Sequence, residues 1–299
     1  MQKIFRILLY VSLLFFLWYL YQADYLIFKE ISFDLPLLIV SLLLMFAGFI
    51  TTGISWALAL RLRGYDVGFP MALVSHGTYI FSKYIPGKFW MVLGRASYLS
   101  GDKNRLRSLS MISFQEQLLF VFWGLVLSII PTFLISKNII TGIILLAVLI
   151  LFIFFLFSPG FHGLSSRLFR KIFRKDFDFK PMKASFFSRV SISVLSYWLL
   201  WSAGFWFLML SVFDTTPLLM AFAYPAGMTY GFIVVFMPAG VGVREGILTS
   251  FLVAGGLSTG DAVTISVISR LWFVAGEVFL FILAWTMKLA GKKTGSHRQ

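Results

Sequence analysis

Two motifs that contain proline and glycine carry basic side chains suited to binding an anion. The first reads Lys83-Tyr84-Ile85-Pro86-Gly87-Lys88, and the second reads Pro238-Ala239-Gly240-Val241-Gly242-Val243-Arg244-Glu245-Gly246. Proline removes a backbone donor and glycine permits positive φ, so we expect a helix to stop and restart within each motif. A helix start carries unpaired N–H groups and about half a positive charge, which favours phosphate or carboxylate. The motifs therefore predict an anion site.

We expect the substrate-binding residues to come from both motifs. They are Lys83, Tyr84, Gly87, Lys88, Gly240, Gly242, Arg244 and Glu245. For the glycines an alternative stays open, because glycines in membrane helices commonly serve close helix packing. Arg95 follows the first motif, and we attribute it to the excess of basic residues near the cytoplasmic ends of membrane segments.

Three further charged residues, Glu116, Arg270 and Glu277, fall within long apolar stretches. An unpaired charge in lipid costs about 2.5–3.5 kcal/mol on insertion scales, so these side chains must face protein or water. We expect Arg270 to pair with Glu116 or with Glu245. Two roles stay open for these residues: ion coupling, or buried pairs that fix helix packing.

The composition indicates that membrane spans must position these residues. Of the 299 residues, 59% are hydrophobic and only 13% are charged, whereas soluble proteins average about 25% charged residues. This balance excludes a water-soluble globule. The sequence has no cysteine, and its three histidines lack metal-ligand spacing, so we predict neither a metal site nor a cofactor.

Six stretches reach the roughly 20 apolar residues that a bilayer core requires. They are 4–21, 35–60, 111–135, 139–157, 190–213 and 262–287. Two more apolar stretches, 69–99 and 218–256, are interrupted near the middle, and we predict that each is a re-entrant hairpin. A rival interpretation makes 218–237 one full span and 247–256 another, although ten helical residues reach only about 15 Å.

The distribution of Lys and Arg predicts the orientation. With both termini in the cytoplasm, the termini and loops on that side together hold nineteen basic residues, and the opposite loops hold only Lys29 and Lys137. This asymmetry predicts a multi-pass protein of the cell membrane, and it argues against a nucleic-acid partner. We predict a single transmembrane domain over 1–290, a basic cytoplasmic loop at 159–189 and a flexible tail at 291–299.

The two predicted hairpins enter the bilayer from opposite faces. The halves 35–135 and 190–289 each read as a span, a broken hairpin and a span. The expected fold class is therefore an all-α polytopic membrane protein with six full spans and two re-entrant broken hairpins in an inverted-topology repeat. Many secondary transporters are organised in this way.

The two motifs, with Gly94-Arg95 after the first, resemble the lysylphosphatidylglycerol synthase transmembrane-region family over about residues 4–289. The resemblance implies a flippase-like membrane domain, which bifunctional members join to a soluble aminoacyl-transferase domain. Only 288–299 follow the last expected helix, so we expect a stand-alone member. Such members resemble flippases of lipids or lipid-linked sugars.

We therefore expect an integral membrane translocator of an anionic phospholipid or a lipid-linked sugar phosphate, and not an enzyme. No P-loop motif is present, which argues against ATP hydrolysis. Two alternatives stay open. The first is a membrane-embedded polyprenyl-lipid phosphatase. The second is a non-transporting membrane partner of a cytoplasmic glycosyltransferase or synthase, which would dock through the basic loop.

Overall fold

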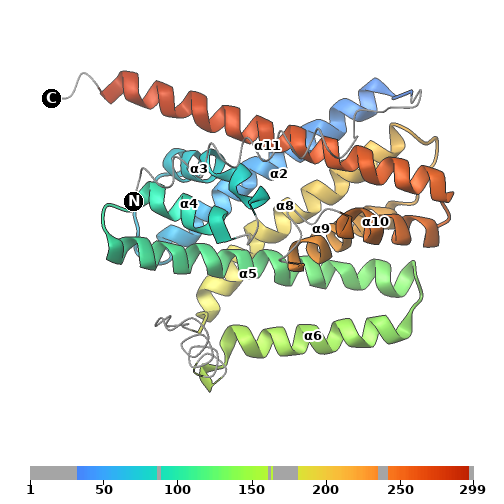
Figure 1. The fold of residues 1–299 in the computed structure, drawn as a ribbon, viewed down its shortest axis with the longest axis horizontal. Coiled ribbons are helices and arrows are strands. Elements are labelled where there is room, and N and C mark those ends of the chain that lie inside the picture. Colours follow the sequence, from blue (N-terminus) through green and yellow to red (C-terminus); the bar gives the residue numbers. More distant parts are fainter. Residues whose placement is uncertain (1–31, 86–88, 161–162, 164–180, 235–241, 296–299) are drawn as a thin grey trace.

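The computed structural model describes residues 32–85, 89–160, 163, 181–234 and 242–295. Within these ranges the chain folds into helices joined by short loops (Figure 1). Five of the helices are long and apolar enough to cross a membrane. They are α2 (Leu35–Arg61), α5 (Lys103–Leu134), α6 (Ile139–Phe157), α8 (Ala184–Leu210) and α11 (Thr259–Gly295). Five of the six expected spans are thus confirmed as long apolar helices, and the expected span 4–21 lies outside the described residues.

Capping side chains mark the starts of two of these helices, α2 and α5. The Asp34 carboxylate accepts the backbone N–H of Leu37 at 3.1 Å at the start of α2. The Asp102 carboxylate accepts the backbone N–H of Arg105 at 2.9 Å at the start of α5. Such caps satisfy orphan donors of the first turn. Because of this cap, α5 begins eight residues before the apolar stretch at 111–135.

The two interrupted stretches form shorter helices, and the predicted breaks are confirmed. The first contains α3 (Phe69–Thr78), the 3₁₀ helix η1 (Ile80–Tyr84) and α4 (Phe89–Leu99). The second contains the 3₁₀ helix η2 (Leu218–Phe222), α9 (Ala223–Ile233) and α10 (Val243–Ala254). The 12 residues of α10 reach only about 18 Å, short of a bilayer core of about 30 Å. The prolines of both motifs, Pro86 and Pro238, lie outside the described residues.

Both broken segments pack between α5 and α11. In the first segment, α4 packs against α5 and α3 packs against α11; in the second, α10 packs against α11 and α9 packs against α5. The helices α2 and α8 pack along each other. Figure 1 shows α3 and α4 toward the end of the molecule where α5 begins, and α10 toward the end where α11 begins. Described residues of both broken segments, among them Tyr84 and Arg244, line one cavity in the interior.

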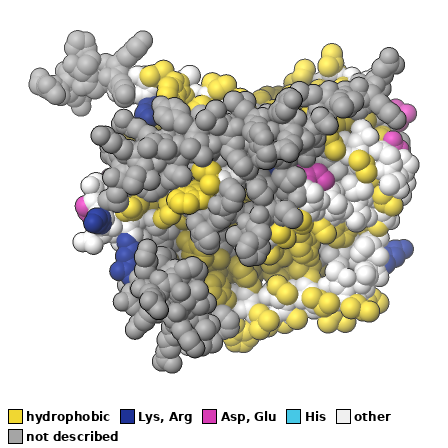
Figure 2. All heavy atoms as spheres, in the orientation of Figure 1, with side chains coloured by type: hydrophobic (Ala, Val, Ile, Leu, Met, Phe, Trp, Pro, Cys, Tyr) yellow, Lys and Arg dark blue, Asp and Glu magenta, His cyan; other side chains and the backbone are white. Residues whose placement is uncertain are grey.

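The outer surface of the long helices is apolar. Large side chains of α6, including Ile140, Ile143, Leu151 and Phe154, are exposed, and α6 packs mainly against α5. In the coloured part of Figure 2, hydrophobic side chains form broad areas, and Lys and Arg side chains lie near the edges of the view. Because lipid is the solvent that favours such a surface, these helix faces are suited to the bilayer.

Candidate functional site: a charged cavity between the broken helices

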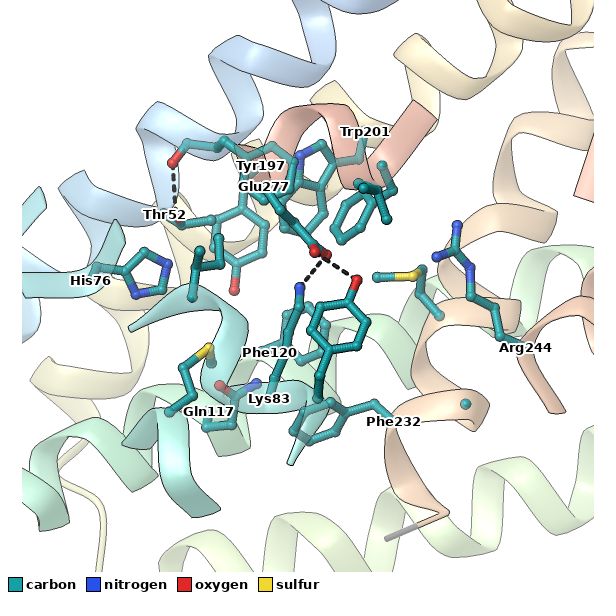
Figure 3. A pocket seen from close by; sticks show the side chains of 18 of the residues that line it. Thr52, His76, Lys83, Gln117, Phe120, Tyr197, Trp201, Phe232, Arg244 and Glu277 are labelled. Atoms are coloured by element: carbon teal, nitrogen blue, oxygen red, sulfur yellow. Dashed lines mark hydrogen bonds and ion pairs between the residues drawn. The ribbon is translucent and has the colours of Figure 1, made fainter. Parts of the chain in front are cut away.

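A cavity of about 120 Å³ lies where the two broken segments meet. Its walls come from α2, α5, α8 and α11 together with both broken segments. Aromatic and aliphatic side chains make up much of the lining, and charged groups project from among them (Figure 3). The charged residues of the lining are Lys83, Arg95, Glu116, Arg244, Arg270 and Glu277.

The carboxylate of Glu277 joins the tip of the first broken segment to α11. It forms an ion pair with the ammonium group of Lys83 and accepts a hydrogen bond of 2.7 Å from the Tyr84 hydroxyl. Figure 3 shows Glu277 pointing into the cavity, with Lys83 directed toward it. The predicted site residues Lys83 and Tyr84 are thus brought together, and both contact a carboxylate that lies 193 residues further along the chain from Tyr84.

Arg95 was interpreted from the sequence as an ordinary basic residue near a membrane surface, and this interpretation is wrong. The residue is only 1% exposed, and its Nη1 atom lies 2.6 Å from the Glu116 carboxylate. It also donates to the Ser113 hydroxyl at 2.6 Å and contacts His76 Nδ1 at 3.3 Å. The packing of α4 against α5 carries Arg95 into the interior, where burial requires a counter-ion. Glu116 is therefore paired with Arg95, and not with Arg270.

The expected contact between Arg270 and Glu245 is confirmed, with 3.2 Å between Arg270 Nη1 and Glu245 Oε1. The other oxygen of Glu245 accepts the backbone N–H of Gly242 at 2.8 Å, which caps the start of α10. Gly242 adopts a φ of +77°, a conformation that favours glycine. One N–H group at this helix start is therefore occupied by a carboxylate of the chain itself.

Arg244 differs from the other charged residues of the cavity. It is 4% exposed, and its Nη2 atom donates to the Tyr224 hydroxyl at 3.3 Å and to the Ser269 carbonyl at 3.2 Å. Its guanidinium carbon lies 5.2 Å from the ring centre of Tyr224 and 5.5 Å from that of Phe273, which adds cation–π attraction. Among the residues that the structure describes, no carboxylate forms an ion pair with Arg244.

A close approach of α9 and α10 holds the backbone of Arg244 in place. A Cβ atom added to Gly231 would lie 2.9 Å from the Arg244 Cβ atom, and one added to Gly227 would lie 3.1 Å from the Arg244 carbonyl oxygen. The two glycines form a Gly-x-x-x-Gly sequence within an apolar stretch, which is typical of closely packed membrane helices. This pattern was the signal that sequence reasoning missed at this site.

Three predicted site residues, Gly87, Lys88 and Gly240, lie outside the described residues. In the described ranges, histidine and carboxylate side chains form no group of three that would hold a metal ion. What the described part of the cavity offers is a set of cations, carboxylates, hydroxyl groups and aromatic faces. These groups can bind a charged or zwitterionic ligand through hydrogen bonds and ion pairs.

The long apolar helices, the broken segments and the buried charged cavity define a polytopic helical membrane protein with an internal polar site. Residues 3–276 match the family described as the lysylphosphatidylglycerol synthase TM region, and the chain belongs to this family. No curated protein matches the chain at a significant level. The family places the protein among membrane proteins with a lipid-related function.

Proposed function

We propose that this protein moves an anionic lipid, either a phospholipid or a lipid-linked sugar phosphate, across the bilayer. The observation that carries the proposal is Arg244, a buried cation that lines the cavity and has no carboxylate partner among the described residues. A buried charge without a counter-ion is costly, and a phosphate group would supply one. Its oxygens match the planar donors of a guanidinium group.

The pairing of charges around the cavity supports an anionic ligand. Arg95, Lys83 and Arg270 are each matched by one carboxylate, from Glu116, Glu277 and Glu245 respectively. Arg244 is the remaining cation of the described lining, so the site carries an excess positive charge. Lys83 and Arg244 both lie within 5.5 Å of the centre of the Phe273 ring, so a headgroup beside this ring can reach both cations.

We further propose that the two halves form an inverted-topology repeat with re-entrant hairpins. The helices α2, α3, α4 and α5 of the first half correspond in order to α8, α9, α10 and α11 of the second half. Corresponding helices pack alike: α4 packs on α5 as α10 packs on α11, and α3 packs on α11 as α9 packs on α5. With the expected span at 4–21, such a chain has six full spans. Both termini would then lie on the cytoplasmic side of the cell membrane, next to the basic loops.

Binding and release, without bond cleavage, fit the arrangement of the carboxylates. Hydrolysis of a phosphate ester calls for an acid–base pair or a nucleophile beside the bound phosphate. Among the described residues, Glu116 and Glu277 are each held by a basic residue of another helix, Arg95 on α4 and Lys83 on η1. We therefore propose that the protein is not an enzyme and needs no cofactor. A glycosyltransferase or synthase that supplies or uses the lipid is a partner consistent with this role.

Lipid translocation in reconstituted vesicles tests the proposal. Vesicles would carry either an anionic phospholipid or a lipid-linked sugar phosphate with a labelled headgroup, and the label reaching the opposite leaflet would be measured. We expect faster translocation than in protein-free vesicles for at least one lipid class. Arg244→Ala should slow it about 10- to 100-fold, because hydrogen bonds to a charged group contribute about 1.5–3 kcal/mol.

Two further variants sharpen this test. Arg244→Lys keeps the charge but loses the forked donors, so its rate should fall between those of the wild type and Arg244→Ala. Arg105→Ala is the matched control, because Arg105 lies on the exposed start of α5 and does not line the cavity. Wild-type rates in Arg244→Ala would overturn the proposal, as would the absence of accelerated translocation for both lipid classes. Release of inorganic phosphate from the lipid would favour the phosphatase alternative.

A further inference from the structure

Glu277 is the carboxylate that links the two halves of the protein inside the cavity. It is 1% exposed and lies on α11, whereas both of its partners in the described residues, Lys83 and Tyr84, lie on η1 at the tip of the first broken segment. The pairs formed by Glu116 and Glu245 instead join neighbouring elements, α5 to α4 and α10 to α11. A change at the Glu277 pair therefore acts on the contact between the halves.

The two members of this pair differ in their access to the cavity. The side chain of Lys83 is 22% exposed, and that of Glu277 is 2% exposed. The Lys83 ammonium group also lies 5.0 Å from the centre of the Phe273 ring, the ring that Arg244 approaches from α10. An anion bound at Arg244 can therefore contact Lys83 while Glu277 stays buried behind it.

Such an anion would compete with Glu277 for Lys83. The charged and titratable groups that face this region from the surrounding elements are His76, Lys83, Tyr84, Arg95, Glu116, Tyr197, Tyr224, Arg244, Glu245 and Arg270. Arg95 and Arg270 already have carboxylate partners, and the bound anion would occupy Arg244. With Lys83 also engaged, no cation of the described lining would remain for Glu277. A buried carboxylate without a cation is costly, and uptake of a proton removes its charge.

We propose that Glu277 is a proton-binding site, and that its protonation accompanies the binding of the lipid phosphate to Lys83 and Arg244. This inference rests on the proposed function and adds the coupling ion to it. The proton comes from water on the side to which the cavity is open, and Glu277 keeps the Tyr84 hydroxyl as its partner. On the opposite side the phosphate leaves, the proton returns to water and Lys83 pairs with Glu277 again. Headgroup and proton thus cross in the same direction.

Translocation under an imposed pH gradient tests the coupling. Vesicles would contain the purified full-length protein, a headgroup-labelled anionic lipid and an internal pH-sensitive dye, with the membrane potential clamped by potassium and valinomycin. We expect net movement of the headgroup toward the alkaline side, reversal when the gradient is reversed, and a proton flux that requires the lipid. Gradient-independent translocation would overturn the coupling and leave the proposed function intact. The absence of any translocation would count against both.

The variant Glu277→Gln separates coupling from binding. Glutamine has the size of a protonated glutamate and cannot exchange a proton, so we expect continued lipid exchange with no response to the pH gradient and no lipid-dependent proton flux. Asp261→Asn is the matched control, since Asp261 is an exposed acid near the start of the same helix and does not line the cavity. It should retain the full gradient response.

A double variant covers the case in which Glu277→Gln fails to fold. Lys83→Gln combined with Glu277→Gln leaves neither charge unpaired. It should translocate lipid more slowly than the wild type, because Lys83 no longer binds the phosphate, and the remaining rate should not respond to the gradient. A gradient response of wild-type size in either folded variant would overturn the assignment of Glu277 as the proton site.

Discussion

The close packing of α9 on α10 leads to a test of how Arg244 is positioned. A Cβ atom on Gly231 would lie 2.9 Å from the Cβ atom, 3.3 Å from the Cα atom and 3.4 Å from the nitrogen of Arg244. Carbon atoms in ordinary contact are about 3.5–4.0 Å apart. Gly231→Ala must therefore separate the two helices at this point by roughly 0.6–1 Å.

The expected loss of stability is modest, whereas the expected loss of function is large. Overpacking costs about 1–3 kcal/mol, and alanine regains about 1 kcal/mol of helix propensity relative to glycine. We therefore expect the free energy of unfolding to fall by about 0–2 kcal/mol. The hydrogen bonds from Arg244 to Tyr224 and Ser269 are already 3.2–3.4 Å long, so this separation would break them. Lipid translocation should then approach the low rate of Arg244→Ala.

Two measurements on one preparation check this prediction: thermal unfolding in detergent, and lipid translocation in vesicles. Gly246→Ala is the matched control, because a Cβ atom there has no neighbour within 4 Å and the residue is exposed on α10. It should gain about 0.5–1 kcal/mol of stability and keep the wild-type rate. If Gly231→Ala matched the wild type in both measurements, the close approach would not be what positions Arg244.

Three further predictions concern ion pairs and caps. Glu116→Gln leaves Arg95 buried without its carboxylate and should lower the free energy of unfolding by about 3–5 kcal/mol, measured by thermal unfolding. The double variant Arg95→Met with Glu116→Leu should restore most of this loss. A double variant as unstable as Glu116→Gln would contradict the pairing. Glu245→Ala removes both the ion pair with Arg270 and the cap of α10, whereas Glu245→Gln keeps an oxygen for the cap. In the same assay, the alanine variant should be less stable than the glutamine variant by about 0.5–2 kcal/mol. Asp34→Ala removes the cap of α2 and should lower the free energy of unfolding by about 1 kcal/mol. Lipid translocation should not change, and a slower rate would show that this cap affects the cavity.

The sequence predicted the long helices and their interruptions well because both depend on local properties. An apolar stretch of sufficient length indicates a membrane helix, and proline with glycine indicates where a helix stops. The contact between Glu245 and Arg270 was also predictable, since it joins two consecutive elements, α10 and α11. Helix starts were predicted less well, because caps such as Asp102 extend a helix into polar sequence.

The remaining features of the site depend on contacts between distant parts of the chain. No local pattern connects Glu277 with Tyr84, since this contact arises when η1 packs against α11. Arg95 was misassigned because a basic residue near a segment end fits either a surface position or the interior. Only the packing of α4 against α5 decides between them.

The ion pairs of the cavity fall into two kinds with different consequences for movement. In the proposed repeat, Arg95 with Glu116 and Glu245 with Arg270 occupy corresponding places, with the signs of the charges exchanged. Each of these pairs joins the second short helix of a broken segment to the long helix that follows it, so both pairs persist if the halves move as units. The Lys83 pair crosses between the halves and must change when they separate. In the proposed function, a ligand that engages Lys83 and Arg244 therefore acts on a described ion pair that joins the two halves. The packing of α2 on α8, of α3 on α11 and of α9 on α5 also joins them, so breaking this pair weakens the contact between the halves without by itself separating them.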